Sequence, residues 1–294
     1  MTDTLGTTGG RPSVRIERRY PHPIEKVWRA VTEPEHLSSW FPSPVELELR
    51  PGGPMRFAAF AEGEGGTGRV TTVEPPHRFE FRWGAEEIRI ELSESGAETV
   101  VVLTHVFDDR PLGASLAAGW GACLAGLAAV VAGEPLPAPS REIDRHEELV
   151  RLLGLDQPVL TEADGQWTAT FDRQLTCPAD VAWRLFLGRA EAPATGAELR
   201  PAGAPGGVLG TVTAVEAERL LAFDVAAGEP GDRVRVELVA GSGHGARLVL
   251  TVQGADPAER TAAVERWGEG AVEHIARQAA RWAHTEEGAG VSAL

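Results

Sequence analysis

The stretch P-I-E-K-V-W-R at residues 23–29 returns later in the chain as P-A-D-V-A-W-R at residues 178–184. Both copies place proline where a helix can begin and put their apolar residues at helical spacing behind it. Three more pairs of segments follow in the same order: 49–53 with 199–203, 68–74 with 210–216, and 120–121 with 267–268. A repeat of residues 14–133 as residues 167–284 predicts two related domains, because each copy is long enough to bury its own core.

The first copy alternates between helical and strand periodicity in a fixed order. The pattern predicts one strand, two helices, six strands and one long helix, at residues 14–20, 23–31, 34–40, 45–49, 55–60, 68–73, 79–83, 88–92, 100–107 and 112–132. Because helices and strands are segregated along the chain, the predicted class is α+β. Each domain is expected to be a curved antiparallel sheet wrapped around a long C-terminal helix.

The remaining segments are expected to lie outside the two domains. Residues 1–13 are polar and rich in Gly and Thr, which predicts a disordered leader. Residues 134–166 are interpreted as a linker with one helix at 141–153, and residues 285–294 as a tail. The second copy is degenerate, because the step from Gly53 to Gly68 is 68 − 53 = 15 residues and that from Gly203 to Gly210 only 210 − 203 = 7.

The amino-acid composition argues against some classes of binding partner. The formal net charge of −15 makes nucleic acid and anionic membranes poor partners. The two cysteines, Cys123 and Cys177, are far apart and have no metal-binding or redox spacing, which favours reduced thiols in a cytoplasmic protein. The uncharged segment 111–133 is long enough to cross a bilayer, but its counterpart around 265–274 is heavily charged, so a buried helix and no membrane association are expected.

No cofactor or metal is expected. Residues 63–68 match G-x-G-x-x-G, yet they lie between two predicted strands with no helix behind them, so a hairpin turn is favoured over a dinucleotide loop. The histidines do not show the spacing of zinc ligands.

The first copy resembles the START-like SRPBCC superfamily, in its branch of homologues of the activator of heat-shock-protein ATPase. The resemblance rests on residues 23–37 with Trp40-Phe41, on 49–53, on 68–79, on Leu103-Thr104-His105 and on Gly119-Trp120. It implies a helix-grip fold whose sheet and long helix enclose a hydrophobic cavity. Such families include ligand carriers, polyketide cyclases and cochaperone modules, so the resemblance alone does not name a function.

Strand alternation and the second copy together predict which residues line that cavity. In the second copy Leu248, Leu250 and Val252 alternate with Arg247, so the aligned Val101, Leu103 and His105 are expected to point inward. His105 is interpreted either as a polar anchor or acid/base for a ligand, or as a strand-end histidine satisfied by a backbone carbonyl or water.

Aromatic residues supply the other candidates. Trp120 is retained in the second copy as Trp267, which favours core packing, whereas Trp40 and Trp83 are not retained. Met55 and Phe57 belong to a strand that the second copy lacks and are interpreted as either core or pocket. The candidate ligand-binding residues are therefore Trp40, Met55, Phe57, Trp83, Leu103, His105 and Trp120.

The sequence favours a small hydrophobic or aromatic ligand bound in the first domain, with the second domain in a supporting role. Burial of the ligand's apolar surface would stabilise the complex, and His105 would orient the ligand. The first alternative is a cyclase, dehydratase or hydrolase that uses His105 as acid/base. The second is a cochaperone-like module that binds another protein.

The uncharged helix at 112–132 also raises the question of what covers its outer side. We hypothesise that the second domain or a second protomer packs there, through Gly119, Gly121, Ala125 and Ala129.

Overall fold

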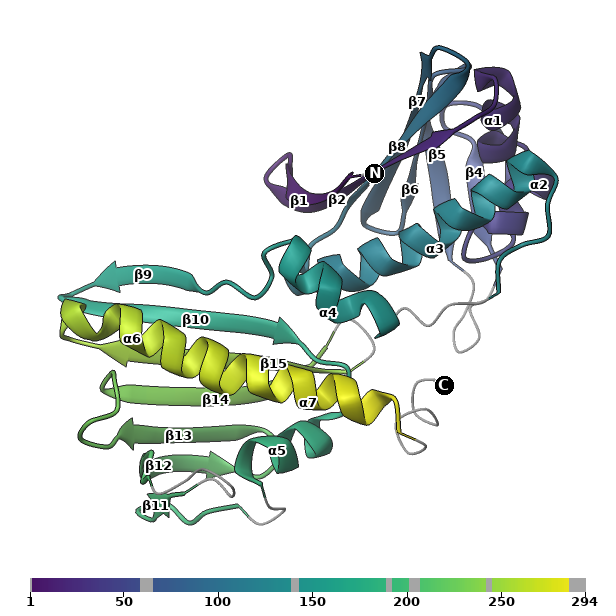
Figure 1. The fold of residues 1–294 in the computed structure, drawn as a ribbon. Helices are drawn as coiled ribbons and strands as arrows, with labels where there is room; N and C mark the ends of the chain where they lie inside the picture. Colours follow the sequence, from purple (N-terminus) through teal and green to yellow (C-terminus); the bar gives the residue numbers. More distant parts are fainter. Residues whose placement is uncertain are drawn as a thin grey trace. The chain divides into compact units, whose positions relative to one another are not determined.

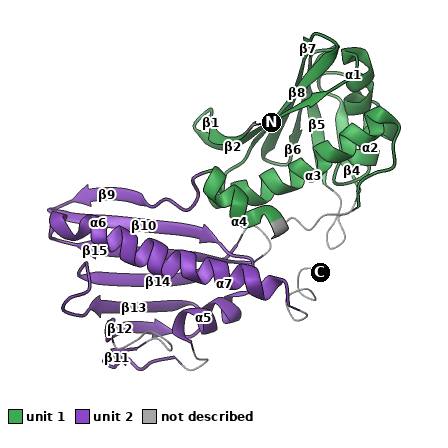
Figure 2. Ribbon diagram, viewed as in Figure 1, with its two compact units in different colours: residues 1–153, 294 green, residues 154–293 purple. Residues whose placement is uncertain are grey.

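The computed structural model describes residues 2–58, 66–138, 143–188, 192–200, 207–241 and 245–285. The chain divides into two compact units, residues 1–153 and residues 154–293 (Figure 2). Each unit carries one antiparallel sheet with one long helix across it (Figure 1). The fold is α+β with two helix-grip domains in tandem, as the sequence predicts. The expected tail lies outside the described residues from 286 onward.

The sheet of unit 1 has the order β1-β2-β8-β7-β6-β5-β4-β3, and its neighbouring strands are antiparallel. Its strands are β1 (Thr2–Thr8), β2 (Arg11–Tyr20), β3 (Val45–Leu47), β4 (Pro54–Phe57), β5 (Thr67–Glu74), β6 (Arg78–Trp83), β7 (Glu86–Ser95) and β8 (Glu98–Val106). Side chains alternate between the inner and outer face of each strand, which leaves one apolar face to be covered.

Helices cover this inner face. They are α1 (Ile24–Thr32), α2 (Pro34–Trp40), the short turn η1 (Arg110–Leu112) and α3 (Gly113–Ala132). α1 buries Ile24, Val27, Trp28 and Val31, the face that the helical spacing predicts. α3 ends at Gly133, whose φ of +73° closes the helix in the left-handed conformation that glycine adopts at low cost.

The expectation of a disordered leader over residues 1–13 is wrong. Thr2–Thr8 forms β1, which pairs along its whole length with β2 across a two-residue turn at Gly9-Gly10. Both glycines have positive φ, as the tight hairpin turn requires. A partly buried ion pair between Arg18 and Asp3, with a nitrogen–oxygen distance of 2.6 Å, links the two strands of the hairpin.

Unit 2 repeats this plan, in the order β11-β12-β13-β14-β15-β10-β9. Its strands are β9 (Val159–Ala163), β10 (Gln166–Gln174), β11 (Glu198–Leu199), β12 (Gly210–Glu216), β13 (Leu220–Val225), β14 (Arg233–Ala240) and β15 (Ala246–Gly254). β9 and β10 form the equivalent of the β1–β2 hairpin, with Asp164-Gly165 at positive φ in the turn. β9 therefore belongs to the second sheet, although it lies within the stretch expected to be a linker.

The two sheets share a further irregularity but differ at one edge. The β5–β6 register shifts between Val70 and Thr72, and the β12–β13 register shifts at the aligned Val212 and Ala214. In unit 2 the edge strand β11 pairs directly with β12, whereas β4 lies between the corresponding strands of unit 1. The described residues of unit 2 thus lack counterparts of α2 and β4.

The helices of unit 2 are α5 (Ala179–Leu187), η2 (Pro257–Glu259), α6 (Arg260–Val264), the π-helix η3 (Glu265–Val272) and α7 (Glu273–Ala283). The Asp256 carboxylate accepts a hydrogen bond from the Ala258 N–H at 2.9 Å and begins the last helical run, as its sequence predicts. The π-helical turn was not predicted. A Cβ on Gly268 would lie 2.6 Å from Cε1 of Phe171, so the helix approaches the sheet there more closely than a larger residue allows.

The connector helix α4 (Ile143–Leu152) packs against α3 within unit 1. A Cβ on Gly121 would lie 3.5 Å from a guanidinium nitrogen of Arg145, so α4 covers part of the uncharged side of α3. Only alanines remain exposed on the rest of that side, such as Ala122 and Ala125. A contact with a second protomer or with the second domain stays a prediction.

Tyr20 provides a test of how α3 is attached to the sheet. Its buried hydroxyl donates to the Leu124 carbonyl at 3.0 Å, and burial raises the pKa of the phenol. The folded state therefore disfavours the phenolate, and this stabilisation is complete below about pH 10 and is lost as the pH rises further. Because Tyr20 is the chain's one tyrosine, its ultraviolet absorbance should change only together with alkaline unfolding.

Reversible ionisation of Tyr20 near its ordinary pKa in the folded chain would contradict this attachment. The Tyr20→Phe variant is the control, because it should lack the absorbance change and lose about 1 kcal/mol of stability in urea.

The two cysteines should differ in reactivity. Burial, together with the charge of Asp180, raises the pKa of the Cys177 thiol to about 12, whereas Cys123 is half-buried. At about pH 8 a chromogenic disulfide reagent should modify Cys123 and leave Cys177 intact until the chain unfolds. A Cys123→Ser variant that still reacts rapidly while folded would show that Cys177 is accessible.

Candidate functional site

β8, the last strand of unit 1, turns inward the residues that strand alternation predicts. Val101, Leu103 and His105 of β8 are all buried on the inner face. The sheet register places His105 between Val14 of β2 and Ile88 of β7, which are also fully buried. His105 is therefore an ionisable side chain set into an apolar wall.

His105 is held at both ring nitrogens. The indole Nε1–H of Trp120 on α3 donates to His105 Nδ1 at 2.9 Å, and His105 Nε2 lies 2.8 Å from Oε2 of Glu86. An indole nitrogen can only donate, so Nδ1 must be the acceptor and the proton lies on Nε2. The imidazole is thus a neutral tautomer that donates to Glu86, and its partners are side chains rather than the backbone carbonyl or water of the simpler interpretation.

Glu86 was not among the residues predicted from the sequence. It begins β7 two residues before Ile88, so the same alternation that turns Ile88 inward also turns Glu86 to the inner face. Glu86 is 35% exposed at its side chain, whereas His105 is 2% exposed. The carboxylate thus connects a buried imidazole with solvent.

A cluster of aromatic rings lies against this polar pair. Phe41, which directly follows α2, is its centre: its ring centroid lies 5.5 Å from those of Trp83 and Trp120 and 5.7 Å from that of Phe57. Phe57 and Trp83 stack at 4.6 Å. These distances mean that the rings contact one another directly. Phe41 was missing from the predicted set, although it follows Trp40 on a segment that the second copy lacks.

The structure brings the predicted residues together but buries them unequally. Those at most 4% exposed are Trp40, Met55, Phe57, Leu103, His105 and Trp120. Trp40 also donates its Nε1–H to the Ala30 carbonyl at 2.9 Å, a structural bond that fixes α2 on α1. Trp83 is half-buried and is the cross-strand neighbour of Glu86. Trp83 and Glu86 are thus the members of this group that face solvent.

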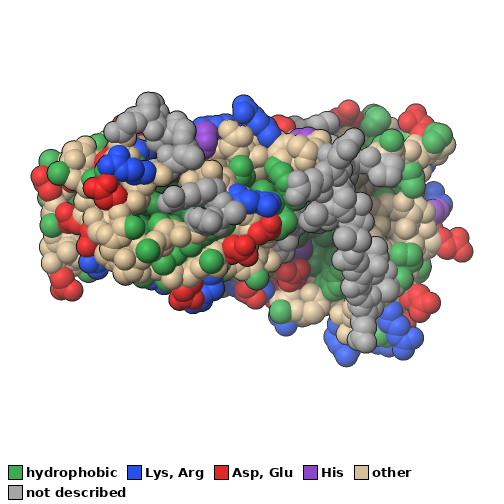
Figure 3. All heavy atoms as spheres, turned by 90° about the horizontal axis from the view of Figure 1, so that it is seen from below, with side chains coloured by type: hydrophobic (Ala, Val, Ile, Leu, Met, Phe, Trp, Pro, Cys, Tyr) green, Lys and Arg blue, Asp and Glu red, His purple; other side chains and the backbone are tan. Residues whose placement is uncertain are grey.

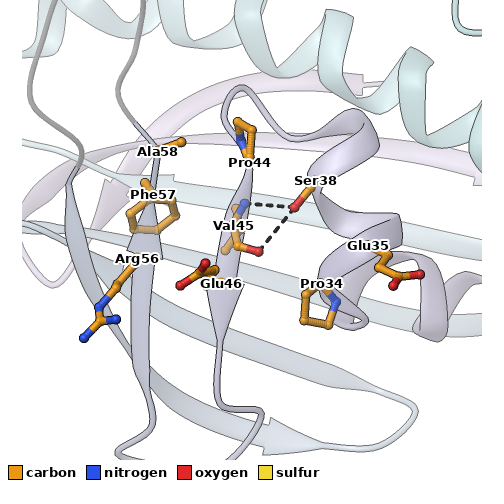
Figure 4. Close-up of a pocket in the computed structure, with 9 residues that line it drawn as sticks. All are labelled: Pro34, Glu35, Ser38, Pro44, Val45, Glu46, Arg56, Phe57 and Ala58. Atoms are coloured by element: carbon orange, nitrogen blue, oxygen red, sulfur yellow. Dashed lines mark hydrogen bonds between the residues drawn. The ribbon is translucent and has the colours of Figure 1, made fainter.

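A hollow lies at the opposite edge of the sheet, beside β3 and β4. It measures about 450 Å³ and is lined by Pro34, Glu35, Ser38, Pro44, Val45, Glu46, Arg56, Phe57 and Ala58 (Figure 4). Ser38 on α2 accepts from the Val45 N–H at 2.8 Å and donates to the Val45 carbonyl at 3.2 Å. Ser38 thereby forms hydrogen bonds with the N–H and the carbonyl of Val45 in the edge strand β3. These groups are then not available for pairing with a strand of another chain.

Unit 2 lacks the polar pair at the same place. Val252 pairs with Val234 there, as His105 pairs with Ile88 in unit 1. Trp267, which aligns with Trp120, donates its Nε1–H to the Pro230 carbonyl at 2.9 Å. A tryptophan on the long helix is therefore common to both units, but only in unit 1 does a histidine accept the hydrogen bond from its indole N–H.

The described ranges contain no group of three or more His, Cys, Asp or Glu side chains that could hold a metal ion. Acidic and basic side chains both occur along the face drawn in Figure 3. One helical run, Arg110–Ala132, has the length and apolar composition of a membrane span, yet more than half of its most apolar window is buried inside the structure. The core helix of a domain has the same properties, so absence of membrane association remains a prediction.

Residues 21–132 match the model of the family described as Activator of Hsp90 ATPase homolog 1-like protein. The match runs from three residues before α1 to the end of α3, and so includes His105, Glu86, Trp120 and the ring cluster. This match confirms the resemblance of the first copy to a START-like branch of the SRPBCC superfamily that its sequence shows.

Several solved structures are similar over about half of the chain. CalU16 from Micromonospora echinospora is 24% identical, with 51% of this chain and 95% of that chain covered and a TM-score of 0.43. EF2215 from Enterococcus faecalis, a conserved protein of unknown function, is 22% identical, with 51% and 88% covered and a TM-score of 0.45. The protein of gene BPP1335 from Bordetella parapertussis is 29% identical, with 48% and 86% covered and a TM-score of 0.40. No curated protein matches the chain.

The tautomer of His105 can be tested directly. Nitrogen NMR of labelled imidazoles should show His105 protonated at Nε2, with its signals assigned through a His105→Val variant. Replacing Trp120 by Phe removes the donor to Nδ1 and should change these signals, at a cost of at least about 1 kcal/mol. Trp267→Phe should leave them unchanged. A proton on Nδ1 in the unaltered chain would refute the network.

Proposed function

We propose that unit 1 binds a small hydrophobic or aromatic ligand at the end of the ring cluster where Trp83 and Glu86 meet solvent. The observation that carries this proposal is the His105–Glu86 pair, which joins a buried imidazole in an apolar wall to a partly exposed carboxylate. The rings of Phe41, Phe57 and Trp120 would form the apolar side of the site.

The fold does not require this pair. Placing an imidazole in an apolar wall carries a desolvation cost, which hydrogen bonds offset only when both nitrogens find partners. Unit 2 keeps the same strand order and the same tryptophan with Val252 in place of His105. A residue that the scaffold can replace by valine is better explained by a function of unit 1 than by stability.

The ring cluster supplies the affinity in this proposal. A ligand that buries about 200 Å² of apolar surface gains about 5 kcal/mol before the cost of ordering is subtracted. Trp83 is the half-buried ring of this cluster, and it packs against Phe57 and Phe41. His105 would act indirectly, because its bond fixes the Glu86 carboxylate that meets the ligand.

In this proposal unit 2 supports unit 1 rather than binding a ligand itself. Its described residues lack counterparts of α2 and β4, the elements that carry Trp40, Met55 and Phe57. Val225 stands at the position of Trp83.

An enzyme that transfers a proton is the second candidate, favoured by the 2.8 Å bond between Glu86 and His105. Since both nitrogens of His105 already have partners, a proton would be exchanged with a ligand at Glu86 rather than at the imidazole. Chemical conversion of a bound ligand would distinguish this candidate from a binding protein.

Binding can be tested with a neutral apolar dye such as N-phenyl-1-naphthylamine, titrated into the full chain and followed by dye fluorescence. We expect saturable binding that weakens about tenfold in Trp83→Val, which installs the residue of unit 2, because the apolar surface of the indole is lost.

Val225→Ala, at the aligned position of unit 2, is the matched control and should leave dye binding unchanged. Equal loss in both variants, or the absence of saturable binding in the unaltered chain, would overturn the proposed site. Native mass spectrometry of freshly purified chain would show whether a ligand is retained.

A further inference from the structure

The direction of the hydrogen bonds at the site restricts the chemistry of its ligand. Trp120 donates to His105, and His105 donates to Glu86, so every proton in the network points toward the carboxylate. The network therefore ends in a group that only accepts hydrogen bonds. His105 has no free nitrogen to offer a ligand.

Glu86 keeps most of its accepting capacity. An ionised carboxylate has about four lone-pair directions on two oxygens. Across the described part of the chain, His105 is the one partner recorded for this carboxylate. The neighbouring Arg11 is engaged elsewhere, donating to the Ala85 carbonyl at 3.1 Å and to Asp108 at 2.7 Å. A ligand group that approaches Glu86 would therefore meet a carboxylate whose charge is not paired with any lysine or arginine among the described residues.

The surroundings favour a positive charge over a negative one. Trp83 lies directly opposite Glu86 on the same face of the sheet, and its indole and the Phe57 ring stack at 4.6 Å. Aromatic faces attract cations, and the net charge of −15 disfavours anions. In unit 2 the aligned carboxylate, Asp232, already accepts from the Ala255 N–H at 2.8 Å, so it is used by the fold.

We infer that the ligand of unit 1 is an amine: an aromatic or apolar body that packs at the edge of the ring cluster and carries an ammonium or other N–H donor bound to Glu86. This inference rests on the proposed function, since it specifies the chemistry of the ligand at the same site. A carboxylate or phosphate at that end of the ligand would face repulsion from Glu86.

Three probes with the same aromatic body can test the amine inference separately from the proposed function. 1-Naphthylmethylamine, 1-naphthaleneacetate and 1-ethylnaphthalene share the aromatic body and differ in charge. Calorimetric titration of the full chain near neutral pH should give binding of the amine about tenfold tighter than that of the hydrocarbon, with the acid weakest. Glu86→Gln should remove the preference for the amine while the hydrocarbon still binds.

Glu87→Gln is the matched control, because Glu87 is the next residue, pairs with Arg82 at 2.8 Å on the outer face, and should leave the preference intact. Equal affinities for the three probes, tighter binding of the acid, or a preference that survives in Glu86→Gln would overturn the amine inference and leave the proposed function standing. No binding of any probe would overturn both. If Glu86→Gln does not fold, the comparison of amine with acid in the unaltered chain decides.

Discussion

Both units depend on one packing requirement: the apolar inner face of a curved antiparallel sheet must be covered by a long helix. Alternation gives every strand an apolar and a polar side, and the apolar sides of neighbouring strands form a continuous surface. α3 covers that surface in unit 1, where Tyr20 ties it to β2, and the run from η2 to α7 covers it in unit 2. The order of strands is the same in both, even though the described residues of unit 2 lack counterparts of β4 and α2.

A buried tryptophan on that helix creates a second requirement, because its indole N–H must find an acceptor. The two units meet it differently. Trp267 donates to a backbone carbonyl in the loop before β14, which serves only the fold. Trp120 donates to His105, which passes a hydrogen bond on to Glu86. The same structural need thus produces a closed contact in unit 2 and a polar connection to solvent in unit 1.

The aromatic cluster and the polar pair belong together in unit 1 because the same elements carry both. β6 and β7 bring Trp83 opposite Glu86, and α2 and β4 add Phe41 and Phe57 behind Trp83. The described residues of unit 2 lack counterparts of α2 and β4, and with them those of Phe41 and Phe57, and Val252 stands in place of the imidazole. The internal repeat therefore separates what the fold needs from what only one domain has, and it does so within a single chain.

Much of the fold, and part of the candidate site, was determined by the sequence alone. The repeat, the strand alternation and the position of Pro34 fixed the α+β plan, the bounds of α2 and the inward direction of Leu103 and His105, because these depend on local periodicity. Tertiary structure decided the rest. Polar residues 2–8 become a strand because β2 offers an edge on which to pair, and Glu86 joins His105 because two strands and a helix converge on one imidazole. Contacts between residues so distant in the chain leave no local pattern to recognise.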